Sequence, residues 1–284
     1  AKLALHIRRQ VDNRLTRGVI GDIDDILPGL IERSDRVFYT MGVHPEFDQR
    51  LMGWVNGLRA QVGKGRHTPH EFVVLDHVLH DMRLYKSRAE VSAMKRAAKI
   101  AGKAHVRAMK FCRPGRREYE VEAEFLHEFR RNGTEPSYLP IVGGGENGCI
   151  LHYTENRDLL QDGDLLLIDA GCEVDGYASD ITRTFPVNGK FSHAQRQIYD
   201  LVLQAQIAAI NQIKPGKHCK EAHHAAVRTI TRGLVKLGLL KGKVPSLIKS
   251  EAYKRFFMHG TGHWLGLDVH DVGDYKVGDE WRVL

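Results

Sequence analysis

The chain has 284 residues, of which 42% are hydrophobic and 27% charged, and its formal net charge is +7. A chain of this length can bury a sizeable core in one or two domains, and its composition is that of an ordinary soluble globular protein. No apolar run approaches the roughly 20 residues that span a bilayer, and Lys and Arg are scattered without interleaved aromatic side chains. We therefore expect no membrane-spanning segment and no nucleic-acid partner.

The cysteines and the first residues bear on the compartment. The four cysteines are far apart and show no C-x-x-C spacing, which predicts reduced thiols in a cytoplasmic protein. The opening residues, AKLALHIRRQ, contain no sustained apolar region of the kind found in signal peptides. The chain does not begin with Met, and we expect it to be an internal fragment.

Residues 1–83 predict a small α/β unit. RVFYT (36–40) and FVVL (72–75) are short strands, and a helix with apolar residues at 3.6-residue spacing begins at Pro45 between them. The histidines of this stretch have no evident partnering set of acids or cysteines, so surface or packing roles are expected for His67, His70, His77 and His80.

Residues 84–284 predict a second unit that begins with two helices. Ser87 and Glu90 have the spacing of a capping box, and a long helix follows that Pro114-Gly115 ends. Its expected apolar stripe consists of Val91, Met94, Ala98, Ala101 and Ala104. The next helix is expected to end at Asn132-Gly133.

The same pattern occurs again further along the chain. Ser192 and Gln195 form a second capping-box signal, Pro215-Gly216 ends the helix, and another helix follows. Pro114 and Pro215 are 101 residues apart, as are Glu120 and Glu221. The repeat suggests an internal duplication, with the repeated helices on the outside of one curved sheet.

Two carboxylates and a histidine-rich stretch are the strongest chemical signals. The apolar run at 165–168 predicts a buried strand that ends on Asp169, and Asp180 follows eleven residues later. Buried carboxylates need a partner charge, although a turn acid and a surface acid would give the same spacing. MHGTGHWLGLDVHD (258–271) adds three histidines, and its glycines make a helix improbable. Carboxylates with imidazole suit a divalent first-row cation.

Three motifs resemble the pita-bread (M24-like) metallopeptidases, and most closely the Xaa-Pro aminopeptidases (aminopeptidase P). They are NGCILHYTEN (147–156), IDAGCEVDGYASDITRTFPVNGKF (168–191) and MHGTGHWLGLDVHDVG (258–273), in the expected order. The similarity runs from about Arg83 to the end of the chain. It implies an α+β fold: an incomplete pita-bread catalytic domain at 84–284, preceded at 1–83 by the remnant of a smaller α/β domain.

The resemblance also implies roles for individual residues. Asp169, Asp180 and His263 would be metal ligands. The catalytic histidines would be His152, His259 and His270, which position the substrate and help to shuttle protons. Two divalent ions are implied, with Mn²⁺ expected first and Co²⁺ or Zn²⁺ as alternatives, and a hydroxide would bridge them.

The family also needs two glutamates beyond the histidine motif. The acids after His270, which are Asp271, Asp274, Asp279 and Glu280, do not stand in a matching context. We therefore expect three of five ligands here and a chain cut at both ends, with weak metal binding and little activity by itself. A natural short form without activity is the alternative.

The resemblance implies an aminopeptidase that hydrolyses the bond between an N-terminal residue and a following proline. Its partners would be peptides with proline in second position, without nucleic acid or membrane, and a homo-oligomer stays open. The alternatives are a prolidase, which cleaves X-Pro dipeptides, and a catalytically inactive pita-bread binding module. The retained acids and histidines argue against the binding module.

Overall fold

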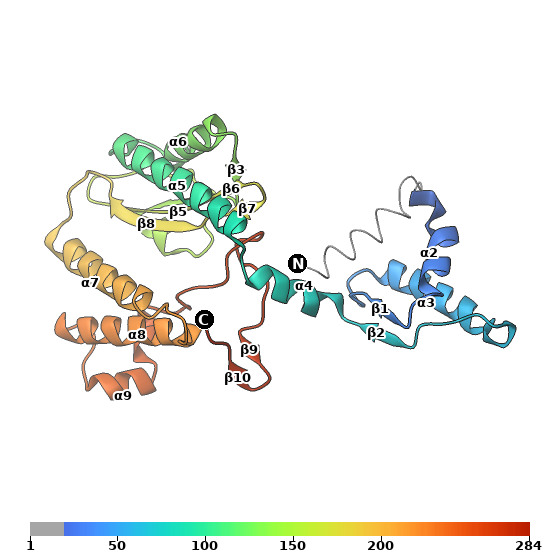
Figure 1. Cartoon of the computed structure of the whole chain (residues 1–284). Coiled ribbons are helices and arrows are strands. Elements are labelled where there is room, and N and C mark those ends of the chain that lie inside the picture. The colour runs from blue at the N-terminus through green and yellow to red at the C-terminus, as the bar shows by residue number, and fades with distance from the viewer. Residues whose placement is uncertain (1–19) are drawn as a thin grey trace. The chain divides into compact units, whose positions relative to one another are not determined.

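The computed structural model describes residues 20–284, which form two compact units that meet between Leu79 and His80 (Figure 1). Helix α4 (Leu75–Leu84), which the sequence did not predict, spans this point. Because a helix is a poor place to divide a chain, we keep a domain boundary at 83/84, the end of α4, as a proposal.

The first unit has the predicted strand–helix–strand order. Its elements are η1 (Ile20–Asp22), α2 (Ile23–Ile31), β1 (Arg36–Phe38), α3 (Pro45–Arg59), η2 (Val62–Lys64) and β2 (Glu71–Val73). Helix α3 begins at a proline, whose fixed φ suits the first turn. Strands β1 and β2 pair in parallel, and a small core joins them to the helices through Ile31, Leu51, Val55 and Leu58.

The second unit begins with a helix pair packed on strands. Helix α5 (Arg88–Phe111) starts at the predicted capping box, and α6 (Glu118–Arg131) packs against it. The buried face of α5 consists of Ala93, Ala97, Ala101, Ala104 and Ala108. Our predicted stripe was therefore partly wrong, since Val91 and Ala98 are exposed. The alanine face lets α6 and the strands approach α5 closely.

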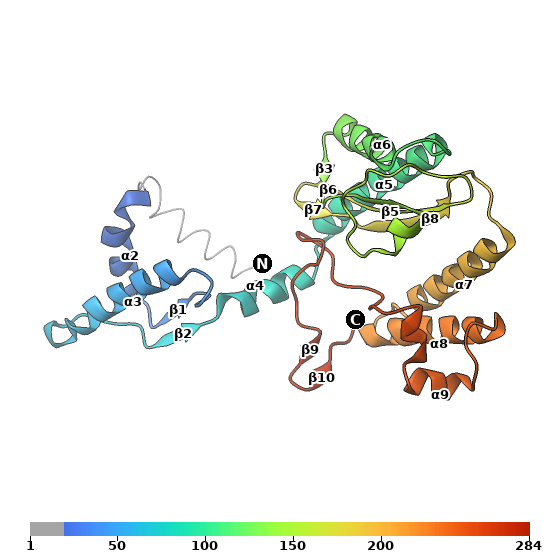
Figure 2. The same cartoon turned by 180° about the vertical axis from the view of Figure 1, so that it is seen from behind.

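The strands of this unit form short antiparallel sheets. One sheet has the order β4 (Ile141–Gly144), β5 (Leu165–Ala170), β8 (Ile181–Pro186). Another has the order β3 (Glu135–Pro136), β6 (Cys172–Val174), β7 (Tyr177–Ala178). Helices α5 and α6 lie on the same side of these strands in both views (Figures 1 and 2). Their common core includes Phe125, Phe129, Leu166 and Ile168.

The second helix pair has a core of its own. Helix α7 (His193–Ile210) starts at Ser192 and Gln195 as predicted, and α8 (Cys219–Lys236), α9 (Val244–Lys249) and η4 (Ala252–Arg255) follow. Glu120 and Glu221 receive backbone N–H groups at the starts of α6 and α8, which matches the predicted repeat. Only α5–α6 share a core with the strands, however, because α7 and α8 bury their apolar residues against each other.

The last part of the chain forms a small hairpin. Strands β9 (Lys276–Val277) and β10 (Glu280–Trp281) pair antiparallel.

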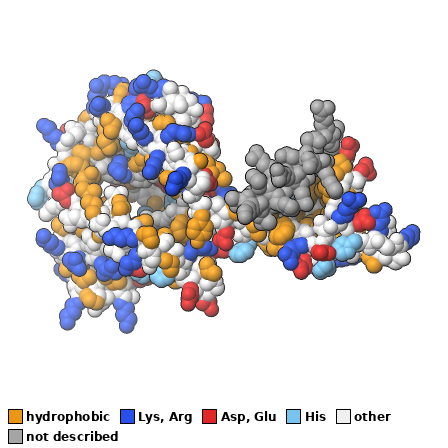
Figure 3. Space-filling view, in the orientation of Figure 1, with side chains coloured by type: hydrophobic (Ala, Val, Ile, Leu, Met, Phe, Trp, Pro, Cys, Tyr) orange, Lys and Arg blue, Asp and Glu red, His pale blue; other side chains and the backbone are white. Residues whose placement is uncertain are grey.

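Figure 3 shows Lys and Arg spread over both helix pairs on this face of the second unit. All four cysteines are free thiols. Among residues 20–284, no helix is both long and apolar enough to cross a membrane.

Candidate metal centre

Strand β5 carries Asp169 on the face opposite the helix core. Leu166, Ile168 and Ala170 are buried on one face, so Asp169 points to the other, because side chains alternate along a strand. Its partner in the neighbouring strand β8 is Thr182. The predicted strand and its terminal acid are thus present, with Asp169 as the last residue but one.

A close backbone approach brings Asp180 to Asp169. A Cβ on Gly171 would lie 1.6 Å from the carbonyl oxygen of Ser179, so only glycine fits there. The Ser179 hydroxyl accepts from Cys172 N–H at 3.0 Å, and the same Ser179 carbonyl accepts from the Ser137 hydroxyl at 2.9 Å. Asp180 follows directly, so these contacts fix the chain just after Asp169 and just before Asp180.

Tyr138 lies between the two carboxylates. Its hydroxyl oxygen is 2.5 Å from Asp169 Oδ1 and 3.0 Å from Asp180 Oδ1, so its single proton can be donated to either. Burial raises the pKa of Asp169, the Asp180 charge raises it further, and the Tyr138 hydrogen bond lowers it. Burial and the two acids also raise the pKa of the Tyr138 hydroxyl, which therefore remains a donor. The acids repel each other here, which a cation would relieve.

The histidine-rich segment has no helix or strand, as predicted, and is anchored by a buried ion pair. Asp271 accepts from Arg83 at 2.5 Å and from Lys86 at 3.0 Å. Burial would raise the pKa of Asp271, but the bonds from Lys86 and Arg83 hold it below its ordinary value. Gly266 lies against this carboxylate, since a Cβ there would be 2.0 Å from Asp271 Oδ2.

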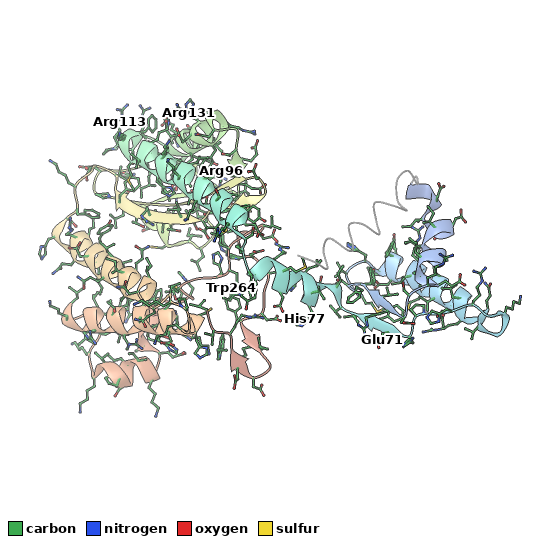
Figure 4. The ribbon with its side chains drawn as sticks, in the orientation of Figure 1. Glu71, His77, Arg96, Arg113, Arg131 and Trp264 are labelled. Carbon is green, nitrogen blue, oxygen red and sulfur yellow. The ribbon has the colours of Figure 1, made fainter. Side chains whose placement is uncertain are left out.

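The anchored segment joins the strands next to Asp180. Ala178 N–H in β7 donates to Gly266 O at 2.8 Å. Trp264 stacks on Tyr275 with ring centroids 5.0 Å apart and an interplanar angle of 13°, and the Tyr275 hydroxyl accepts from Trp264 N–H. Figure 4 shows Trp264 in this part of the second unit. These contacts place His263 opposite Asp180.

His263 is oriented as a metal-binding imidazole would be. Its Nε2 lies 3.1 Å from Asp180 Oδ2, and its Nδ1 lies 2.8 Å from the Trp264 carbonyl oxygen. A carbonyl oxygen can only accept, so Nδ1 carries the proton and donates. In the neutral ring, Nε2 then carries a lone pair that faces the Asp180 carboxylate. This arrangement is favourable only when a cation or a second proton lies between the two. Imidazole ligands of metals commonly donate their other nitrogen to a carbonyl in this way.

The donor set fits divalent cations. Two carboxylates and an imidazole are ligands that first-row divalent ions accept. The ligand atoms of these three side chains do not all lie within 4.8 Å of one another.

The structure brings one of the three expected catalytic histidines to this set. The His270 ring lies 4.2 Å from that of His263, centroid to centroid. His259 bonds to Gly260 O and lies against Phe257. In the described part of the chain, no hydrogen bond, ion pair or ring contact joins His152 or His259 to the carboxylates, and the roles of both stay predictions.

The loop that carries His152 is tied to helix α6. Glu118, fully buried, accepts from Gly144 N–H, Asn147 Nδ2, the Tyr153 hydroxyl and Asp158 N–H. His152 itself is exposed and has a φ of 58°. The backbone of Asn147 approaches Gly143 closely, and a Cβ there would lie 2.9 Å from it.

Two cavities open beside these residues. One of about 420 Å³ is lined by His263, Gly262, Trp264 and His223, together with apolar side chains of α7. The other, of about 440 Å³, lies between β8 and α7 and is lined by Thr182, Ile198 and Val202 among others. Ile198 and Val202 of α7 are exposed on the wall of this second cavity. A small molecule or peptide side chain could reach His263 through the first cavity.

Several site residues had no signal in the sequence. Tyr138 is a single aromatic residue in a loop, and the Arg83–Asp271 pair spans 188 residues of sequence.

The first unit also differs from expectation. Asp35, His67 and His70 have ligand atoms mutually within 4.8 Å, so these two histidines do have an acid partner, and within residues 20–284 this is the only such triple.

An α+β domain with two carboxylates and an imidazole beside an antiparallel sheet has the features of a metalloenzyme. Comparison with known families agrees: residues 92–284 match the model of metallopeptidase family M24. The chain belongs to this family, and the fold of its second unit is the pita-bread fold.

The most similar relatives include aminopeptidases of bacteria. The Xaa-Pro aminopeptidase of Escherichia coli K12 is 49% identical over 264 residues, which cover 93% of this chain and 60% of the relative. The structure of Pseudomonas aeruginosa aminopeptidase PepP has a TM-score of 0.91 and 61% identity, over 94% of this chain and 61% of that one. The chain thus spans about 60% of the length of these relatives.

Solved structures of E. coli aminopeptidase P add two observations about that enzyme. A zinc-substituted form in complex with product has a TM-score of 0.88 and 49% identity, over 93% of this chain and 60% of that one. Other structures are single histidine-to-alanine variants, and the four substituted histidines follow one another at the intervals of His152, His259, His263 and His270.

Proposed function

We propose that the complete protein is a metal-dependent Xaa-Pro aminopeptidase, which releases an N-terminal residue that precedes proline. One observation carries the proposal. Three separate segments bring Asp169, Asp180 and His263 together beside the sheet. The relatives bear this name and share 49% or more of their aligned residues with the chain.

Asp169, Asp180 and His263 would be three of the five ligands that hold two divalent ions in the complete protein, with Mn²⁺ as our first candidate and Co²⁺ or Zn²⁺ as alternatives. The zinc-substituted E. coli enzyme supports divalent ions in general. When bound, such ions lower the pKa of a water molecule and polarise the scissile carbonyl group.

The chain's own residues prepare this site. Tyr138 donates its one proton to Asp169 or Asp180 and holds the two carboxylates together, and the Trp264 carbonyl keeps the proton of His263 on Nδ1, so that Nε2 would be free to bind a cation. His270 would hold or pass on a proton at its ring nitrogens, and its position beside His263 supports this role. His152 and His259 would contact the peptide, which the matching intervals in the E. coli variants support.

The peptide substrates would carry proline in second position, and the protein would act in the cytoplasm. Four free thiols support a reducing compartment. The cavity beside His263 offers a largely apolar surface to a substrate side chain or ring.

The test is hydrolysis of matched X-Pro and X-Ala peptides by the complete gene product with Mn²⁺ added. We expect cleavage of X-Pro peptides and little cleavage of X-Ala peptides. Equal cleavage of both would contradict the prolyl assignment.

His270→Ala should lower kcat while metal content stays unchanged, because His270 would act on the substrate and not on the ions. Loss of metal in this variant would place His270 among the ligands instead.

A further inference from the structure

We propose that Asp35, His67 and His70 form a zinc site in the first unit, distinct from the M24 centre of the second unit. Asp35 directly precedes β1 and His70 directly precedes β2. Because these strands pair in parallel, their amino ends lie at one edge, and the three side chains meet there. Figure 4 labels Glu71, the first residue of β2, at this place.

The distances suit a single ion. All three side chains offer ligand atoms within 4.8 Å of one another, and His67 Nε2 lies 2.9 Å from Asp35 Oδ1. A tetrahedral zinc with bonds of about 2.0–2.2 Å holds its ligand atoms about 3.4 Å apart. Small rotations of exposed side chains are enough to bring all three onto one ion.

The backbone around the triple is already ordered. His70 N–H and Glu71 N–H both donate to Asp35 O, at 3.0 and 3.2 Å. Between the two histidines, Pro69 is fully buried and Thr68 Oγ1 is buried without a partner, so this turn is held inward while both imidazoles remain outside. Zinc would therefore meet a nearly formed site.

The neighbouring charges leave the triple anionic. Arg36 is paired with Glu71, and Arg66 is paired with Glu32, so the two nearby guanidinium groups are neutralised. Asp35 then supplies the net negative charge of the site. Two imidazoles and one carboxylate favour zinc over Mg²⁺ or Ca²⁺, which prefer oxygen ligands. Because all three side chains are exposed, water can take the fourth position.

A zinc ion here would act as a clamp on the parallel strand pair. It would join the residue before β1 to the two histidines that precede β2, which are more than thirty positions further along the chain. Since the unfolded chain lacks this arrangement, zinc binding would stabilise the folded first unit.

The test is calorimetric titration of the 284-residue chain with Zn²⁺. An Asp169→Asn, Asp180→Asn background removes competition from the second unit. We expect this background to bind one zinc ion per chain, and His67→Ala or His70→Ala to weaken that binding at least about tenfold, since loss of even an outer-shell partner of a ligand costs about 10–100-fold. His44→Ala is the matched control, because His44 is an exposed histidine of the same unit outside the triple, and it should leave binding unchanged.

A thermal readout distinguishes this site from the M24 centre. Zn²⁺ should raise the unfolding temperature of the background and of its His44→Ala form, and should raise it less in the His67→Ala form. If the background variant does not fold, the same histidine variants in the wild-type chain should each lose one bound zinc. Zinc binding that is equal in His67→Ala, His70→Ala and wild type, or that is absent from a folded background and present only in wild type, would overturn the proposal.

Discussion

The carboxylates and the histidines of the candidate centre are held by different kinds of structure. Asp169 and Asp180 lie in or beside paired strands, where the register of β5 with β8 sets their separation. The histidines lie on a segment without helix or strand, which a buried Asp271 and one backbone bond from β7 keep in place. The acid half thus depends on many local bonds, and the histidine half on a few contacts between residues distant in sequence.

The two halves also show opposite electrostatics. Asp169 has a raised pKa because burial and a second acid oppose its charge. Asp271 has a lowered pKa because two cationic side chains outweigh its burial. Charging the first acid therefore costs the folded chain stability, and charging the second adds stability.

Asp180→Asn should have the largest effect, because Asp180 joins the halves through Tyr138 and His263. In the complete protein, we expect activity with Mn²⁺ to fall at least about a thousandfold, or about 4 kcal/mol, while the fold is kept. The measurements are bound metal, turnover and circular dichroism. Asp200→Asn, at an exposed pair with Arg196 on α7, is the control and should be neutral. Near-normal activity with two bound ions would sink the ligand assignment.

Gly171→Ala tests whether close packing sets the acid half. Its Cβ would overlap the Ser179 carbonyl, and backbone cannot rotate away as a side chain can. We expect a loss of roughly 3 kcal/mol or more in the free energy of unfolding, measured with urea. Gly102→Ala on α5 has open space around its Cβ and should stabilise the chain by about 0.5–1 kcal/mol. Similar effects from both would show that the overlap relaxes freely.

Asp271→Asn tests the anchor of the histidine half. Removing the charge leaves Lys86 without its carboxylate, and we expect a loss of about 2–3 kcal/mol at pH 7. Since the folded pKa is lowered, the wild type has this stability above the unfolded value of about 3.9 and loses it as the pH falls below.

Urea unfolding between pH 3 and 7 checks this, and the variant should show a flatter dependence. Asp268→Asn, which removes the more exposed partner of Arg83, should cost less than about 1 kcal/mol. A larger loss from Asp268→Asn than from Asp271→Asn would mean that the anchor has been misplaced.

Asp169→Asn should have the smallest effect on the free energy of unfolding of the metal-free chain, and the opposite sign. Without metal, the wild type loses stability as the pH rises from about 3.9 toward the raised pKa of Asp169, because the charged form is disfavoured. The amide avoids this loss, so we expect the metal-free variant to be more stable by about 1 kcal/mol at pH 7 and to bind Mn²⁺ more weakly. Destabilisation of the metal-free chain would refute the repulsion between the two acids.

Local signals in the sequence predicted the local structure well. The apolar run before Asp169 is strand β5, both Ser capping boxes begin helices, and the glycines of the histidine segment do exclude a helix. The motif spacing also paired Asp180 with His263 across 83 residues, because the family resemblance carries information about distant contacts.

Long-range partners without a motif could not be predicted. Tyr138 reaches the acids only because β3 and β6 pair, and a two-residue strand has no periodicity to detect. The partners of Asp271 come from the end of α4 and the residues after it, and the acid partner of His67 lies before β1. The α5 stripe was misassigned because alanines occur at two helical spacings, and only packing shows which set is buried.

Trp264, which stacks on Tyr275, gives the candidate centre an intrinsic fluorescent probe. The chain has three tryptophans, and Trp264 alone of these is bonded directly to His263 along the backbone, while its carbonyl holds the His263 proton. Indole emission responds to the charge and motion of its surroundings. A cation that arrives at His263 therefore alters the surroundings of a fluorophore already built into the chain, and its arrival can be followed without an attached dye.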